Sequence, residues 1–195
     1  MSMAFVLGNG QSRSGLPLHD LKKHGSIYGC NALFRDFAPE VLVATDRPIA
    51  QHIEETGYSL KNKFYTRRPG AGTGAITIPN PYFGYSSGPV AVALAALAQH
   101  KKIYMLGFDL GPTENKKFNN LYANTEFYKE SGATPTYTGN WVKQIQHICR
   151  EFSETKFVRV CGKTTARLTE LDAIRNMEHL SLEGFVERIN NVKDL

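Results

Sequence analysis

Short apolar runs alternate with helical segments along most of this chain, and no other property of the sequence narrows the choice of fold as much. The predicted strands are residues 3–7, 26–30, 41–45, 63–66, 103–106 and 157–161. Helices are expected after Pro17, around Ile49 and Ile53 as far as Gly57, and over residues 87–99, 141–152 and 182–189. Strands separated by helices are typical of a parallel sheet with helices on both faces.

The fold class predicted from this pattern is α/β, a Rossmann-like parallel sheet in a single domain over residues 1–195. A chain of 195 residues buries about 70% of the surface that its unfolded form exposes, which suits one sizeable core. No repeat or low-complexity linker divides the sequence. Two segments, residues 67–85 and 110–136, are too long for simple connections, and we expect them to act as lids.

Composition excludes several classes of protein. With 42% hydrophobic residues and a net charge of +5, the chain is not expected to be disordered. Its longest apolar run, residues 89–98, is shorter than the roughly 20 residues of a membrane span, and no signal peptide is predicted. The three cysteines are widely spaced and odd in number, which favours a reducing compartment and predicts a cytoplasmic protein without disulfides.

Basic residues are spread through the sequence in pairs and form no dense arm, although the pI is about 9.1. A solvated surface accounts for them best, a phosphate-bearing small molecule comes next, and duplex nucleic acid is not expected. The six histidines have no metal-ligand spacing, so no metal site is predicted. A homo-oligomer is compatible with the sequence.

Small or polar residues follow the predicted strands. In parallel α/β sheets, ligands bind beyond the carboxyl ends of the strands. The first such segment contains Gly8, Asn9, Gly10 and Ser12, whose backbone N–H groups could hold an anion. The dinucleotide spacing G-x-G-x-x-G fails at Arg13, and a plain turn remains the alternative.

Asn31 and Asp46 follow the second and third predicted strands. An Asn can donate to a phosphate and accept from a sugar hydroxyl, but both residues are also common helix caps. Gly107 and Asp109 follow the strand at 103–106. We expect these four residues to border a binding crevice.

Ser86, Ser87 and Gly88 precede the Ala-rich helix at 87–99. Hydroxyls and free N–H groups at a helix N-terminus favour an oxyanion or a carboxylate, with simple N-capping as the alternative. Two phosphate-loop matches are rejected. Residues 162–164 lack the upstream glycine that such a loop requires, and the glycine-rich segment 70–74 is not followed by Lys and Ser or Thr.

Taken together, these motifs resemble the small bacterial sialyltransferases of the lipooligosaccharide type and the related hydroxymethylpterin diphosphokinases. The resemblance covers about residues 5–171 and rests on the glycine-asparagine-glycine opening, Asn31, Ser86–Ser87–Gly88 and the Gly-x-Asp at residues 107–109. It implies a nucleotide-sugar donor of the CMP type as the ligand. It also implies that Asn9, Gly10, Ser12 and Asn31 hold the nucleotide, that Ser86–Ser87–Gly88 lie beside the donor sugar, and that Gly107 and Asp109 border the nucleotide.

The chain departs from that family at three positions. Gln11 replaces a proline of the opening loop, and Gly111 replaces a lid tyrosine. Asn140 stands where the sialyltransferases have the histidine that acts as general base, and an Asn cannot accept a proton near neutral pH. The resemblance therefore predicts nucleotide binding more firmly than sialyl transfer.

Three functions fit these residues. The first is glycosyl transfer from a nucleotide sugar, in which Tyr122, Tyr128, Tyr137 or His147 assists the leaving group or the acceptor. The second is transfer of pyrophosphate from ATP to a small alcohol, with magnesium held by Asp46 and Asp109. The third is nucleotide binding without catalysis, because the base histidine and the lid tyrosine are missing.

Overall fold

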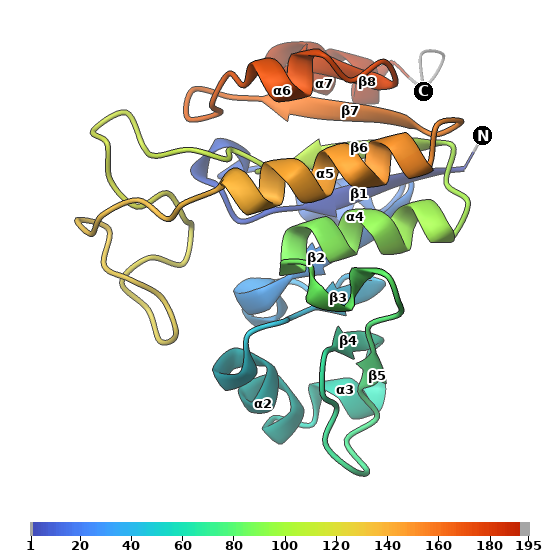
Figure 1. The fold of residues 1–195 in the computed structure, drawn as a ribbon, viewed down its shortest axis with the longest axis vertical. Helices are drawn as coiled ribbons and strands as arrows, with labels where there is room; N and C mark the ends of the chain where they lie inside the picture. Colours follow the sequence, from blue (N-terminus) through green and yellow to red (C-terminus); the bar gives the residue numbers. More distant parts are fainter. Residues whose placement is uncertain (1, 192–195) are drawn as a thin grey trace.

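Eight parallel strands form one sheet in the computed structural model, which describes residues 2–191. The order across the sheet is β5-β4-β3-β2-β1-β6-β7-β8, with β8 at the top and β5 at the bottom of Figure 1. The strands are β1 Met3–Leu7, β2 Ser26–Cys30, β3 Val41–Val43, β4 Phe64–Thr66, β5 Ile76–Thr77, β6 Lys102–Leu106, β7 Lys156–Cys161 and β8 Met177–Ser181. The α/β parallel-sheet fold predicted from the sequence is confirmed.

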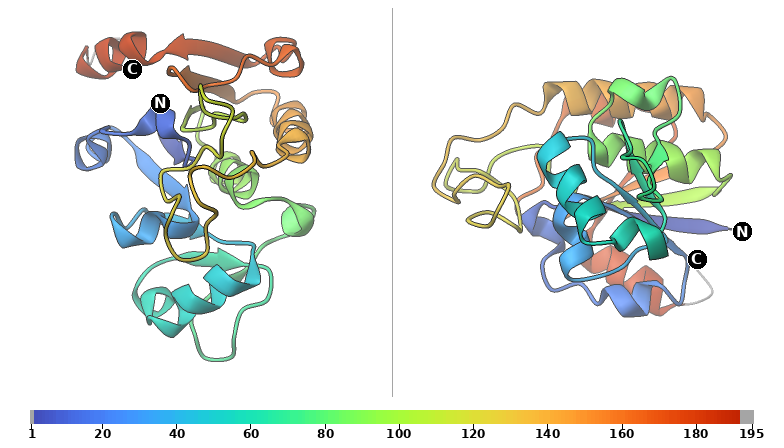
Figure 2. Two further views of the ribbon diagram at one scale, coloured as in Figure 1. Left: turned by 90° about the vertical axis from the view of Figure 1, so that its left-hand side faces the viewer. Right: turned by 90° about the horizontal axis from the view of Figure 1, so that it is seen from below.

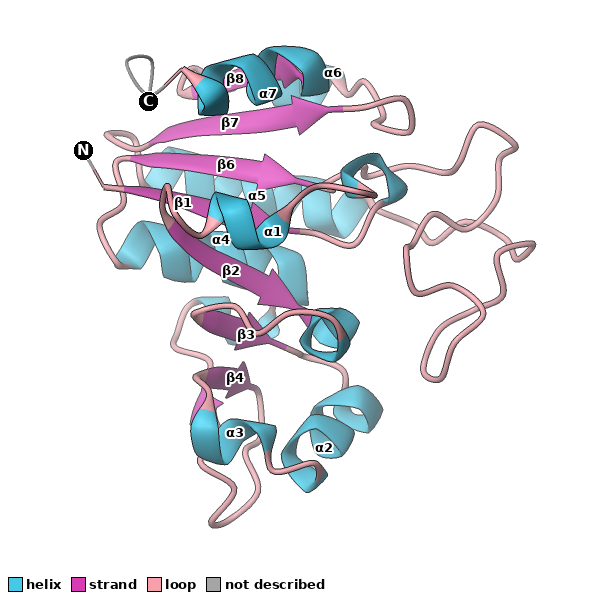
Figure 3. Cartoon of the chain, turned by 180° about the vertical axis from the view of Figure 1, so that it is seen from behind, coloured by secondary structure: helices cyan, strands magenta, loops and turns pink. Residues whose placement is uncertain are grey.

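Helices lie on both faces of the sheet, as Figures 1 and 3 show from opposite sides. The α-helices are α1 Leu18–Leu21, α2 Arg47–Glu55, α3 Tyr58–Lys61, α4 Ser87–Leu97, α5 Gly139–Glu151, α6 Thr169–Asp172 and α7 Leu182–Asn190. Three 3₁₀ turns accompany them: η1 Gln11–Arg13, η2 Asn31–Arg35 and η3 Tyr82–Gly84.

The alternating side chains of β1 divide the core into two layers. Ala4 and Val6 pack with residues of α4 and α5, whereas Phe5 and Leu7 pack with residues of α1, η2, α2 and α7. Because α4 lies between the sheet and α5, nearly all of its side chains are buried, as its Ala-rich sequence predicts. No helix of residues 2–191 has the length and apolar character required to cross a bilayer.

The direction of strand addition reverses next to β1. The chain builds β2 to β5 on one side of β1 and then returns through α4 to place β6 on the other side. In open α/β sheets, such a reversal leaves a crevice at the carboxyl ends of the two central strands. The segments after β1 and β6 therefore lie at the place where a ligand is expected.

Three sequence expectations about the fold are wrong. The strand at 157–161 is not the last, because β8 forms a further edge strand whose side chains are partly exposed and have no apolar run. The strand predicted at 41–45 ends at Val43. Residues 67–85 are not one continuous loop, since they contain β5 and η3.

Candidate functional site

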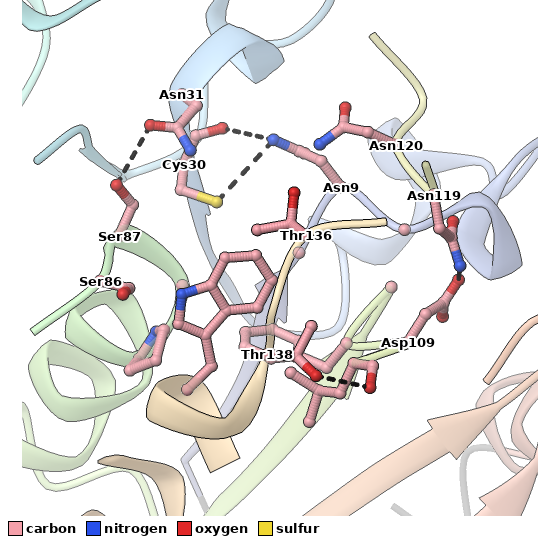
Figure 4. A pocket seen from close by; sticks show the side chains of 18 of the residues that line it. Asn9, Cys30, Asn31, Ser86, Ser87, Asp109, Asn119, Asn120, Thr136 and Thr138 are labelled. Atoms are coloured by element: carbon pink, nitrogen blue, oxygen red, sulfur yellow. Dashed lines mark hydrogen bonds between the residues drawn. The ribbon is translucent and has the colours of Figure 1, made fainter. Parts of the chain in front are cut away.

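A cavity of about 280 Å³ opens at the carboxyl edge of β1, β2, β3 and β6, and we call it the central cavity. Figure 4 shows the polar side chains around it. Its lining comprises Gly8, Asn9, Gly10, Cys30, Asn31, Thr45, Asp46, Ser86, Ser87, Gly88, Pro89, Gly107, Phe108, Asp109, Leu110, Gly111, Phe118, Asn119, Asn120, Pro135, Thr136, Thr138 and Trp141. Of the ligand-binding residues predicted from the sequence, the structure brings all but Ser12 to this lining.

The glycines after β1 allow two backbone segments to approach closely. A Cβ on Gly8 would lie 2.6 Å from the carbonyl oxygen of Gly107, and a Cβ on Gly10 would lie 2.5 Å from the Asp109 carboxylate. Gly107 itself has a φ of +73°, in the left-handed region that favours glycine. The glycines therefore allow the β1 and β6 loops to contact each other directly.

Asp109 is the acceptor at the centre of this junction. Its side chain is 2% exposed, and five groups donate to it: Ser12 N, Ser12 Oγ, Asn119 Nδ2, Thr164 Oγ1 and Thr165 Oγ1. A carboxylate offers about four lone-pair positions, so these donors use its whole capacity. Asp109 thus connects the β1 loop, the segment after β6 and the turn after β7.

The backbone amides of the β1 loop are already used within the protein. Gly10 N donates to Gly107 O, Gln11 N to Asn119 Oδ1 at 2.9 Å, and Ser12 N to Asp109 Oδ2 at 3.1 Å. The expectation that the amides of Gly10 and Ser12 hold a phosphate is therefore not supported. The Ser12 amide, which was expected to donate to a bound anion, donates to the Asp109 carboxylate instead.

Asn9 is held at both ends of its side chain. Its Nδ2 donates to Cys30 O at 3.0 Å, and its Oδ1 accepts from Arg13 Nη2 at 2.8 Å. Arg13 is 6% exposed, and its Nε donates to Gly8 O. Since these acceptors are neutral, the buried guanidinium leaves a positive charge beneath the central cavity.

Ser87 connects three elements at the opposite wall. Its Oγ accepts from Thr45 N at 3.0 Å, lies 3.0 Å from Thr45 Oγ1 and donates to Asn31 Oδ1 at 3.1 Å. These contacts use the hydroxyl fully, so Ser87 positions its neighbours and has no lone pair left for a ligand. Asn31 has a φ of +54° and lines the cavity, and within residues 2–191 its Nδ2 group donates to no protein acceptor.

The N-terminus of α4 faces the cavity without a side-chain cap. Ser86 occupies the N-cap position, but its side chain makes no capping hydrogen bond, and the first turn holds no acidic residue. Ser87 and Gly88 begin the helix on the cavity lining, where the first N–H groups of a helix have no intrahelical partner. The partial positive charge of this end favours an anionic group.

The predicted lid at 110–136 forms the outer wall of the cavity and projects from the carboxyl edge of the sheet (Figure 2). It is fastened to the domain by several contacts. Leu121 N donates to Asn9 O at 2.8 Å, Arg35 Nη1 donates to Thr125 Oγ1 at 2.9 Å, and Ala32 N donates to Tyr128 Oη at 3.2 Å. The other predicted lid, 67–85, lines a neighbouring groove, and none of its residues lines this cavity.

The titratable side chains of the lining differ in their availability. Burial raises the pKa of the Cys30 thiol to about 12, so it stays protonated at neutral pH. The carboxylate of Asp109 is used by protein donors, as described above. Asp46 is exposed and makes no side-chain cap bond to α2, which leaves its carboxylate available.

The catalytic candidates predicted from the sequence do not line the central cavity. Tyr122 donates to Asp36 Oδ2 at 2.7 Å, and burial raises its pKa to about 12. Tyr137 is 74% exposed, and His147 Nδ1 lies 2.8 Å from Tyr85 Oη outside the lining. Tyr128, whose hydroxyl accepts from a backbone amide, is likewise not part of it.

Magnesium held jointly by Asp46 and Asp109 does not fit this geometry, because the donors around Asp109 leave no oxygen for a cation. Within residues 2–191, no three His, Cys, Asp or Glu side chains gather to form a metal site. We therefore derive no chemical step from a bound metal.

Comparison of the chain with protein-family models, with curated proteins and with solved structures finds no match. The interpretation of the site consequently rests on its geometry.

Several lining residues were missed by the sequence analysis: Thr45, Asn119, Asn120, Thr136, Thr138 and Trp141. Of these residues, Asn119 and Asn120 are the ones that the sequence could have indicated as ligand-binding, because two adjacent side-chain amides lie inside a predicted lid. The sequence places Trp141 only in the helix predicted over residues 141–152, which corresponds to α5.

Proposed function

We propose that this protein binds a nucleotide-activated sugar of the CMP type in the central cavity and transfers its glycosyl group to a hydroxyl acceptor. The observation that carries the proposal is the uncapped N-terminus of α4, which faces a cavity whose polar lining is mostly amide and hydroxyl groups. Such groups suit ribose and sugar hydroxyls, and the helix terminus suits a phosphodiester.

The charge of the lining favours this ligand over ATP. Among the described residues that form the cavity, none is Lys, Arg or His. The nearby cations are the buried Arg13 and Arg159, which donate to backbone carbonyl oxygens of lining residues. A triphosphate with about four negative charges needs cations or magnesium for compensation. A single phosphodiester needs only the helix terminus and the field of the buried Arg13 and Arg159. We therefore rank pyrophosphate transfer below glycosyl transfer.

Nucleotide binding without transfer is the second candidate. The observation that favours it is the absence of any Tyr or His side chain from the described lining of the cavity. CMP release from a CMP sugar separates the two candidates. Release at a rate well above that of the uncatalysed reaction supports a transferase, and tight binding without release supports a binding protein.

Replacing Asn31 by Gly is expected to weaken CMP binding about tenfold or more, since a hydrogen bond to a charged group contributes about 1.5–3 kcal/mol. Glycine tolerates the φ of +54°, so the change removes the amide without backbone strain. Isothermal titration calorimetry with CMP measures the effect.

Asn124→Gly is the matched control, because Asn124 has a similar φ of +67° but lies outside the cavity lining. It should bind CMP as the wild type does. Equal affinity of Asn31→Gly and Asn124→Gly for CMP would contradict the proposed contact between Asn31 and the nucleotide.

A further inference from the structure

A second depression adjoins the central cavity. It is an open groove of about 870 Å³ between the start of α2, the β4–β5 connection and η3, and we call it the arginine groove. Thr45 and Asp46 line both the groove and the central cavity. A donor in one and an acceptor in the other would therefore meet at these two residues.

Asp46 is held at this boundary by its neighbours. The backbone N–H of Thr45 and its hydroxyl both contact Ser87 Oγ at 3.0 Å, which fixes the end of β3 against α4. Asp46 O accepts from Ala50 N in the first turn of α2. The backbone on both sides is thus anchored, while the carboxylate forms no hydrogen bond or ion pair within residues 2–191.

Two of the three arginines that line the groove have no partner in the described chain. Arg67 is occupied, because its guanidinium donates to the carbonyl oxygens of Phe83, Gly84 and Tyr85. Arg47 and Arg68 are exposed and have no side-chain partner in the described chain.

The two glutamates of the groove each accept one hydrogen bond from a neutral donor and keep their negative charge. Glu54 accepts from Gly70 N at 2.7 Å, and Glu55 accepts from Gln51 Nε2 at 2.9 Å. Arg47 and Arg68 are therefore the groove cations that no protein group engages, and the Asp46 carboxylate lies where the groove meets the central cavity.

We propose that the arginine groove is the acceptor subsite for a hydroxylated compound with a carboxylate or phosphate group, and that Asp46 is the general base of the transfer. This inference rests on the proposed glycosyl transfer. Arg47 and Arg68 hold the acidic group of the acceptor. Asp46 is the one carboxylate of the central lining that protein donors leave free.

The reaction follows from this arrangement. The acceptor oxygen forms a bond to the anomeric carbon of the donor sugar while the bond from that carbon to the phosphate oxygen breaks. The electron pair of the broken bond leaves on the phosphate oxygen and gives CMP. The proton of the acceptor hydroxyl moves to the Asp46 carboxylate and then to solvent, because Asp46 is exposed.

The test uses purified full-length protein with CMP-N-acetylneuraminate as the donor probe. Glucose, glucuronate and glucose 6-phosphate serve as acceptor probes that share ring hydroxyls and differ in their acidic group. CMP release is followed with each acceptor for the wild type, Asp46→Asn, Arg68→Gln and Arg150→Gln. Arg150 is an exposed arginine of α5 outside both depressions, so Arg150→Gln is the control for loss of a surface charge.

We expect an acidic acceptor to accelerate CMP release more than glucose does, and glucuronate or glucose 6-phosphate identifies which acid is preferred. Asp46→Asn should lower kcat about 100-fold or more, the usual contribution of a general base. Arg68→Gln should raise the KM for the acidic acceptor about tenfold with little change in kcat, whereas Arg150→Gln should match the wild type.

CMP titration of the same variants keeps the two proposals separable. If the wild type does not bind CMP, the proposed function fails. If the wild type releases CMP from the donor but Asp46→Asn does so at the same rate while still binding CMP, the assignment of the base is overturned. Equal acceleration by glucose and both acidic probes, unchanged in Arg68→Gln, overturns the acceptor subsite.

Discussion

Asp109→Asn is expected to lower the free energy of unfolding by about 2–3 kcal/mol, because a hydrogen bond to a charged group contributes about 1.5–3 kcal/mol and a buried donor loses its acceptor. The substitution removes the charge and turns an NH₂ group toward donors such as Ser12, Asn119 and Thr164. At least one of these buried donors then loses its acceptor. Urea unfolding followed by circular dichroism measures the effect.

Asp46→Asn is the matched control for that measurement. Both aspartates follow a strand at the same edge of the sheet, but Asp46 is exposed and forms no cap bond. Its substitution should change the free energy of unfolding by no more than about 0.5 kcal/mol. Similar unfolding midpoints for the two variants would show that Asp109 does not organise the site.

Gly10→Ala is expected to destabilise the protein by about 1–3 kcal/mol and to weaken CMP binding as well. The new Cβ would lie 2.5 Å from the Asp109 carboxylate and 2.7 Å from the carbonyl oxygen of Gly107. Since the backbone of Gly107 cannot move without shifting β6, the β1 loop has to move outward. The carboxylate would then lose its contacts with Ser12.

Gly84→Ala provides the comparison, because a Cβ at that position meets nothing within 4 Å and the backbone is not left-handed. We expect Gly84→Ala to unfold at the same urea concentration as the wild type or slightly above it. If Gly10→Ala behaves like Gly84→Ala in unfolding and in CMP titration, the close junction of the β1 and β6 loops is not required.

The sheet and the position of the site could be predicted from the sequence because both follow from local signals. Buried strands appear as apolar runs, and the residue after each strand lies at the carboxyl edge whatever the rest of the chain does. Asn9, Asn31 and Gly107 are predicted in this way and line the central cavity. The edge strand β8 was missed because its half-exposed side chains give no apolar run.

The roles of the site residues could not be predicted, because they depend on contacts between distant segments. Whether the amide of Ser12 is free for a phosphate depends on Asp109, which lies 97 residues further along the chain. The amide of Gln11 likewise meets Asn119 across 108 residues. Nothing near residues 8–12 in the sequence indicates that these donors are already used.

Nucleotide binding in the central cavity is tested most directly by thermal unfolding with nucleoside mono-, di- and triphosphates, each with and without magnesium. A ligand at 100 times its Kd stabilises the folded state by about 2.7 kcal/mol, which raises the Tm by about 5–10 °C for a chain of this size. The proposed site predicts this increase with CMP, independent of magnesium and reduced in Asn31→Gly. An increase with ATP and magnesium but none with CMP, or no increase with any nucleotide, would contradict it.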